Sequence, residues 1–150
     1  EGKCNKAERQ AAEHFAESLG LAFQLRDDLM DFIATDADAT KTIHQDFSCG
    51  YYTLPAIHTF TYPSCGELLR KIAADLQSGV RCREEAAAEI SKLIEDADGY
   101  GYTMRLIRGY CEEAIRALNV FRDSEAKQCL KQIVESVCKG AERLMDNYML

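Results

Sequence analysis

Three aspartates near the end of one long helical pattern have the clearest capacity for chemistry. Asp27 lies four positions before Asp31, and Asp28 lies three positions before it, so on a helix the three carboxylates share one side. Gln24 lies on the same side, one turn earlier. Like charges at these spacings destabilise a helix by roughly 0.2–0.5 kcal/mol per pair, and Arg26 is the nearby residue that offsets them. Oxygen ligands of this kind suit Mg²⁺ rather than a thiolate or imidazole metal site, so the pattern predicts a magnesium site.

The same acidic spacing is also found on ordinary solvated helix faces. For a bare pair of acids that interpretation is the more frequent one. Here the acids are set among apolar residues, which is not typical of a solvated face. We therefore predict that the carboxylates line a cavity or cleft within a helical bundle. The apolar neighbours are Leu19, Phe23, Met30 and Phe32.

A wider pattern extends on both sides of the aspartates. It comprises Gly20, Phe23, Gln24, Asp27, Asp28 and Asp31, followed by Lys41, Asp46, Gly50, Thr53, Leu54 and Pro55. The first group resembles the second aspartate-rich motif of the trans-isoprenyl diphosphate synthases, and the second group resembles the loop and Thr-Leu-Pro run that follow it. The combined pattern is far more specific than the acidic spacing alone.

Four positions depart from that family pattern. Thr40 and His44 replace glycines, Thr42 replaces a frequent proline, and Tyr51 stands where a lysine is common. The last difference matters most, because a lysine at that position would help to hold diphosphate.

The resemblance implies a fold and an activity. Members of that family are all-α homodimers of the isoprenoid synthase type. They join isopentenyl diphosphate to an allylic diphosphate with the help of Mg²⁺. The metal ions neutralise the diphosphate as it leaves. On that pattern Asp27 is the expected direct Mg²⁺ ligand, and Asp28 and Asp31 contribute directly or through metal-bound water.

The resemblance also implies substrate contacts. Phe23 would pack near the isopentenyl chain, and Gln24 would lie near the allylic diphosphate or the developing cation. Lys41 would contact the leaving diphosphate, and Asp46 would steady that lysine or a metal-bound water. Gln24 and Lys41 are therefore the expected catalytic residues.

The match covers only the C-terminal half of the family pattern. The first aspartate-rich motif, its arginines and an upstream Lys-Thr pair have no counterpart; Lys3 and Lys6 lie too near Gln24 and lack the threonine. We expect one all-α domain over residues 1–150 that works with the missing N-terminal half or with a partner chain.

A non-catalytic partner subunit or diphosphate-binding module remains the alternative. A terpene cyclase is disfavoured by Phe23-Gln24 and the Thr-Leu-Pro run, and a purely structural acidic bundle leaves the apolar setting of the acids unexplained.

Composition limits the class of protein. The 150 residues include 25 acidic and 18 basic side chains, a net charge of −7, which disfavours nonspecific nucleic-acid binding. The sequence predicts no membrane span and no signal peptide, and hence a cytosolic location. The seven cysteines are an odd number without CxxC spacing, so we expect reduced thiols rather than zinc ligands or a disulfide framework.

Hydrophobic periodicity and capping signals predict helices throughout. The first begins at the Asn5 cap and runs to about Thr35, with Phe23 in its inward-facing stripe. Gly20 within it should permit close approach of a neighbouring element or of substrate. A loop should follow over residues 36–50. Further helices are predicted over 53–61, from a Ser64–Glu67 capping box to 77, over 83–96, after a turn at 100–103, and after a Ser124 cap.

Overall fold

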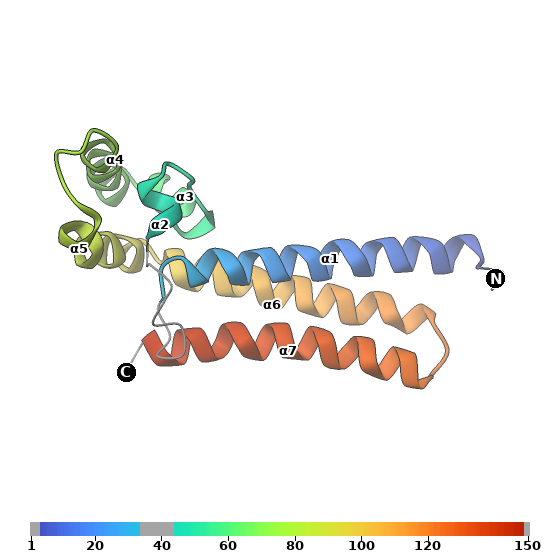
Figure 1. Ribbon diagram of the computed structural model, residues 1–150. Coiled ribbons are helices and arrows are strands. Elements are labelled where there is room, and N and C mark those ends of the chain that lie inside the picture. Colours follow the sequence, from blue (N-terminus) through green and yellow to red (C-terminus); the bar gives the residue numbers. More distant parts are fainter. Residues whose placement is uncertain (1–3, 34–43, 149–150) are drawn as a thin grey trace.

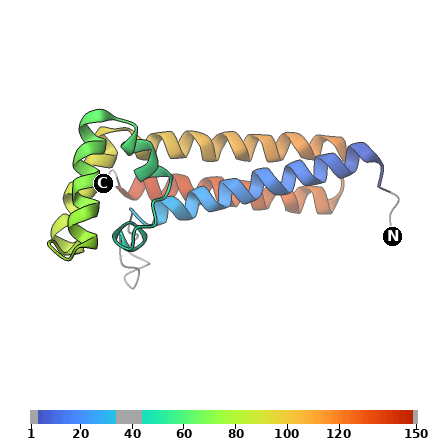
Figure 2. The ribbon, with the colours of Figure 1, turned by 90° about the horizontal axis from the view of Figure 1, so that it is seen from above.

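Three long helices lie side by side and form the body of the protein (Figure 1). The computed structural model describes residues 4–33 and 44–148. α1 (Lys6–Met30) and α7 (Glu125–Tyr148) run in the same direction, and α6 (Gly99–Ala117) runs antiparallel to both. The short helices gather at the end where α1 finishes, as the view from above also shows (Figure 2). The described residues contain no strand, which confirms the all-α prediction.

α1 begins where the sequence predicts. The Asn5 side chain accepts a hydrogen bond from the Glu8 backbone N–H at 2.9 Å, and the Glu8 carboxylate accepts one from the Asn5 backbone N–H at 2.9 Å. These reciprocal bonds satisfy two N–H groups that would otherwise lack partners. The helix ends at Met30, earlier than predicted. Phe32 and Ile33 are instead buried beyond its end, where they contribute to the core.

The core between the long helices depends on small side chains at close contacts. Ala22 of α1, Ala114 of α6 and Ala141 of α7 are fully buried, and so are Leu29 and Ile107. Alanines let the helix axes approach, and the larger residues fill the space between them. At the start of α7 the Ser124 hydroxyl accepts a hydrogen bond from the Lys127 N–H at 3.2 Å, which confirms the predicted cap.

Four shorter helices lie between α1 and α6 in the described part of the chain. They are α2 (Gln45–Ser48), α3 (Leu54–Phe60), α4 (Pro63–Gln77) and α5 (Arg83–Asp96). α5 has the predicted bounds, whereas α2 lies inside the segment predicted to be a loop. A single turn of helix carries too little periodicity to be recognised from sequence.

Two local predictions were wrong. The Ser64–Glu67 capping box does not form, because α4 begins at Pro63, whose fixed φ suits a first helical position. The predicted turn at 100–103 is the first turn of α6. Gly99 opens that turn, and a Cβ there would lie 2.7 Å from the Pro55 carbonyl oxygen, so the absence of a side chain permits the contact between α3 and α6.

No helix in the described part of the chain combines the length and the apolar character needed to cross a membrane.

Candidate functional site

Asp27 is the most directly charge-paired of the three aspartates. Its Oδ1 accepts a hydrogen bond from Nη2 of Arg26 at 3.1 Å, and 42% of its side chain is exposed. The Arg26 guanidinium also lies over the Phe23 ring, 4.3 Å from the ring centre. Phe23 itself is 47% exposed, so its predicted place in the inward stripe of α1 was wrong. Its exposed ring extends the apolar surface that leads up to the acids.

Asp28 connects α1 to the start of α3. Its Oδ1 accepts a hydrogen bond from the Gln24 side-chain amide at 3.0 Å, and its Oδ2 accepts one from the Leu54 backbone N–H at 3.2 Å. Leu54 is the first residue of α3, and the N-cap residue Thr53 makes no side-chain capping bond. The Asp28 carboxylate therefore performs the capping role from a different helix.

Asp31 connects α1 to α2 in a similar way. Its Oδ1 accepts a hydrogen bond from the Asp46 backbone N–H at 3.1 Å, and its backbone carbonyl accepts one from the His44 N–H at 2.6 Å. Burial raises the pKa of the Asp31 carboxyl, and the nearby Asp46 carboxylate adds to the rise, while the backbone bond from Asp46 opposes it. The structure thus brings Asp31 and Asp46 together, although Asp46 is exposed.

The donor chemistry of these acids fits a hard divalent cation, because carboxylate oxygens are the ligands that Mg²⁺ prefers. Asp31 Oδ2 is buried and has no hydrogen-bond partner among the described residues. Asp28 carries a hydrogen bond on each oxygen, so Asp27 and Asp31 are better placed than Asp28 to bind a cation. Within residues 4–33 and 44–148, however, no three acidic, histidine or cysteine side chains converge on one point. A cation would therefore need further ligands.

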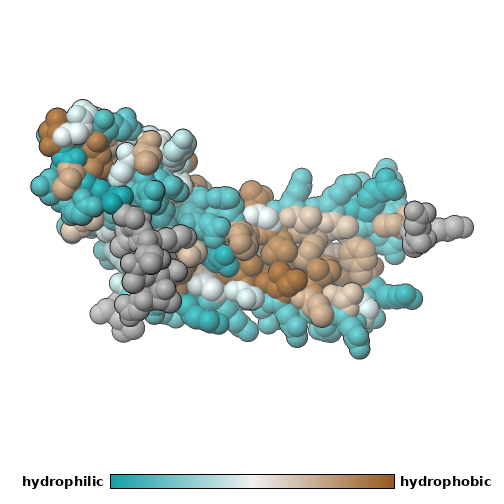
Figure 3. All heavy atoms as spheres, viewed as in Figure 1, coloured by the Kyte–Doolittle hydropathy of each residue, from teal (hydrophilic) through white to brown (hydrophobic). Residues whose placement is uncertain are grey.

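An open apolar groove precedes the aspartates along α1. It has a volume of about 580 Å³ and is formed by α1 and α7. Figure 3 shows apolar residues gathered on the face between these two helices. Outside the backbone of its own helix, a Cβ at Gly20 would meet no atom within 4 Å, so no other element among the described residues approaches it closely. Approach by substrate at Gly20 stays a prediction. The groove lining stops at Arg26, one residue before the first aspartate, and comprises Phe15, Ala16, Leu19, Gly20, Phe23, Arg26, Ile133, Ser136 and Val137.

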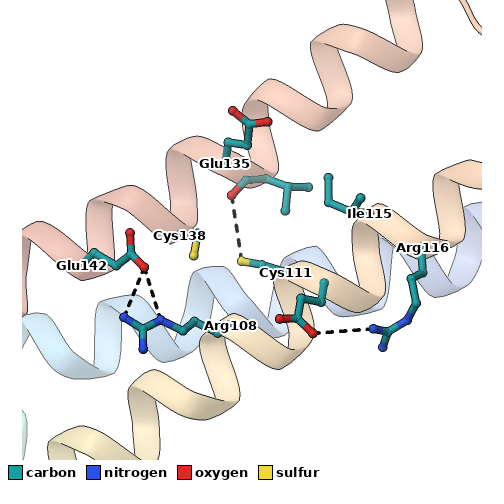
Figure 4. A pocket seen from close by; sticks show the side chains of 9 residues that line it. Arg108, Cys111, Ile115, Arg116, Glu135, Cys138 and Glu142 are labelled. Atoms are coloured by element: carbon teal, nitrogen blue, oxygen red, sulfur yellow. Dashed lines mark hydrogen bonds and ion pairs between the residues drawn. The ribbon is translucent and has the colours of Figure 1, made fainter.

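A second groove, of about 510 Å³, lies between α6 and α7 (Figure 4). Cys111 and Cys138 face each other across its floor, and Arg108 pairs with Glu142 at its rim at 3.2 Å. Its lining includes none of the predicted site residues, so this groove is separate from the acidic end of α1.

Two findings concern the segment between α1 and α2. Lys41, predicted to contact diphosphate, lies outside the described residues. His44 is 1% exposed and adopts a left-handed backbone conformation with φ 60°. The replacement of a motif glycine by histidine was the signal in the sequence, because such a glycine often marks a positive φ.

Comparison with known proteins decides the family. A sequence profile described as Polyprenyl synthetase matches residues 2–95. The chain belongs to the polyprenyl synthetase family. It is 32% identical over 140 residues to a protein of Neurospora crassa named as a probable mitochondrial hexaprenyl pyrophosphate synthase, and the match covers 92% of this chain and 29% of that protein.

One further relative and one solved structure show the extent of the match. Heptaprenyl diphosphate synthase component 2 of Bacillus subtilis is 24% identical over 125 residues, covering 83% of this chain and 34% of the relative. The crystal structure of geranylgeranyl pyrophosphate synthase from Bacteroides thetaiotaomicron shares the fold, with a TM-score of 0.72 and 23% identity over 91% of this chain and 43% of that one. The chain therefore spans less than half the length of each of these proteins.

Proposed function

We propose that this chain supplies the second aspartate-rich part of a Mg²⁺-dependent prenyltransferase, which joins isopentenyl diphosphate to an allylic diphosphate. One observation carries the proposal: α1 presents an open apolar groove and, immediately beyond it, a set of carboxylates. A prenyl diphosphate has the same division into a hydrocarbon chain and a charged head. Family membership supports the assignment.

Each side chain has a distinct part in this proposal. Asp27 and Asp31 would hold Mg²⁺, whereas Asp28 keeps α3 and Gln24 in place through its two hydrogen bonds. Bound Mg²⁺ supplies charge neutralisation to a diphosphate. Phe23 offers the hydrocarbon chain an exposed ring beside the acids, and the Arg26 guanidinium restrains that ring. Lys41 is proposed to contact the diphosphate, and Asp46 to steady that lysine or a metal-bound water.

A partner-subunit function is the second candidate, because one relative is named as component 2 of a synthase. In that case the chain would bind substrate without completing the reaction alone. The two candidates differ in one measurement. Condensation of radiolabelled isopentenyl diphosphate by a longer polypeptide that joins this sequence to a first aspartate-rich motif favours the enzyme, and no product from that polypeptide favours the partner subunit.

Calorimetry with inorganic diphosphate tests the proposed Mg²⁺ and diphosphate site on this chain. We expect binding to strengthen by at least about tenfold when Mg²⁺ is added, because Mg²⁺ prefers sites completed by phosphate oxygens. Asp27→Ala should abolish that increase. Asp96→Ala is the matched control, since Asp96 is a half-exposed aspartate that pairs with Lys92 on α5. Equal diphosphate binding with and without Mg²⁺ would contradict the proposed metal bridge.

This chain alone should not condense the two substrates at a useful rate. Departure of diphosphate needs charge neutralisation from more than one side, and removal of a single preorganised electrostatic group already costs roughly 10²–10³ in rate. Robust product from the 150 residues would show that the other ligands come from within them. The resemblance also predicts that this chain forms a homodimer, and sedimentation of the same preparation tests that separately.

A further inference from the structure

We propose that His44 is a positioning residue: it fastens α2 to α1 and α5 and thereby holds the Asp46 backbone N–H at the Asp31 carboxylate. The part of this inference that concerns diphosphate rests on the proposed function. The fastening itself rests on the geometry of His44, which differs from that of an ordinary core histidine in its backbone and in its connections.

The backbone of His44 is in a costly conformation. Its φ of 60° and ψ of 25° place it in the left-handed region, which is unfavourable for a residue with a Cβ because the Cβ lies too close to the following carbonyl oxygen. A glycine would avoid this cost. The histidine must therefore gain compensating interactions through its side chain.

The imidazole provides those interactions by joining two other elements. Its Nε2 lies 3.2 Å from Oγ of Ser91 in α5, and its ring centre lies 5.4 Å from that of Phe32, just beyond α1. The side chain is 1% exposed, so it fills core volume as well as forming a polar contact. A glycine at this position would relieve the backbone and lose both contacts.

The main chain of His44 connects this anchor to the site. Its N–H donates to the Asp31 carbonyl at 2.6 Å, and its carbonyl accepts from the Ser48 N–H at 3.0 Å and from the Ser48 hydroxyl at 2.6 Å. Two residues later, the Asp46 N–H donates to Asp31 Oδ1 at 3.1 Å. A shift of His44 therefore moves the group that orients the Asp31 carboxylate.

Substitution by glycine separates this role from simple packing. If His44 were only a strained residue, His44→Gly would leave α2 unchanged or steadier. We expect instead that His44→Gly and Ser91→Ala each raise the hydrogen-exchange rate of the Asp46 amide by at least about tenfold, as measured by NMR under conditions where the variants stay folded. His44→Asn should retain part of the protection, because asparagine tolerates the left-handed region and still offers a polar side chain.

A matched control removes the effect of general destabilisation. Val134→Ala truncates a buried residue of α7 near Cys111, in the interface with α6, and should leave Asp46 exchange at the wild-type rate when the proteins are compared at equal global stability. Unchanged Asp46 exchange in His44→Gly, or an equal increase in Val134→Ala, would overturn the inference.

Calorimetry with Mg²⁺ and inorganic diphosphate then tests the link to the site. We expect His44→Gly to weaken binding by at least about fivefold while Val134→Ala binds as the wild type does. Wild-type affinity in His44→Gly would overturn the positioning role. If the wild type shows no Mg²⁺-dependent binding, the proposed function fails instead, and the exchange rates alone decide whether His44 fastens α2.

Discussion

The carboxylate of Asp28 caps a helix to which it does not belong: its Oδ2 accepts a hydrogen bond from the backbone N–H of Leu54, the first residue of α3, at 3.2 Å. Twenty-six positions separate the two residues in the sequence. Asp31 forms the equivalent contact with the Asp46 N–H in α2. These two acids therefore hold the short helices against α1, and this structural role is separate from any metal binding.

Loss of the Asp28 cap should lower stability. Asp28→Ala is expected to decrease the free energy of unfolding by about 0.5–2 kcal/mol, the usual cost of removing a cap. Relief of repulsion from its acidic neighbours returns only about 0.2–0.5 kcal/mol per pair, so the loss prevails. Asp28→Asn keeps an acceptor oxygen and should retain most of the stability. Urea denaturation of the three proteins measures the difference, and an alanine variant as stable as the asparagine variant would contradict the capping role.

The buried imidazole of His44 should make the protein sensitive to acid. Burial lowers the pKa of His44 from 6.5 to about 4, and the positive charge of Arg83 makes a smaller contribution to the decrease. Between these values the unfolded chain binds the extra proton, so the free energy of unfolding falls as the pH falls from 6.5 to 4, by at most roughly 3 kcal/mol. Below about pH 4 this contribution no longer changes.

Other titratable groups lie near His44, so its effect on the free energy of unfolding must be measured as a difference between two proteins. The raised pKa of Asp31 acts in the opposite direction, because the folded state holds the Asp31 proton more firmly than the unfolded chain does. The Asp46 carboxylate and the phenol of Tyr100 also lie nearby. Comparison of wild type with His44→Asn across pH 4–7 isolates the histidine. Parallel stability curves for the two proteins would show that His44 does not cause the acid sensitivity.

Tyr51 offers a test by gain of affinity. It is 70% exposed, and its backbone N–H donates to the Asp46 carbonyl at 2.9 Å, so its side chain emerges beside α2. Tyr51→Lys places a cation where the family pattern commonly has one. We expect Mg²⁺-dependent diphosphate binding to strengthen by about three- to tenfold, because charge-assisted contacts to phosphate are strong. Tyr51→Gln, which adds no charge, should not strengthen it; equal gains from both variants would exclude a charge contact.

Cys111 should be an unreactive thiol in the folded protein. Burial raises the pKa of Cys111 to about 12, and the adjacent Cys138 thiol makes a smaller contribution to the rise. Since the thiolate is the reactive form, its alkylation at pH 8 should be at least about 100-fold slower than in the urea-unfolded chain. Mass spectrometry after timed iodoacetamide treatment measures both rates. Exposed Cys49 provides the control that reagent reaches the folded protein, and fast labelling of Cys111 would contradict the burial seen in the structure.

The sequence by itself determined most of the helical framework. The Asn5 and Glu8 pair, the Ser124 cap and the apolar periodicity of α5, α6 and α7 act between residues a few positions apart, so they could be recognised without a structure. The same local spacing placed Asp27, Asp28 and Asp31 on one side of a helix. It also carried the family pattern that the comparison confirmed.

Only the tertiary structure decided how those acids are used. The bonds from Asp28 to α3, from Asp31 to α2 and from His44 to Ser91 join residues 26, 15 and 47 positions apart. Such contacts depend on how the helices pack, and no local periodicity encodes them. For the same reason α2 was missed and Phe23 was assigned to the wrong face. Whether a single turn forms, and where an aromatic ring lies, depend on the surrounding elements. A capped helix of several turns depends largely on its own sequence.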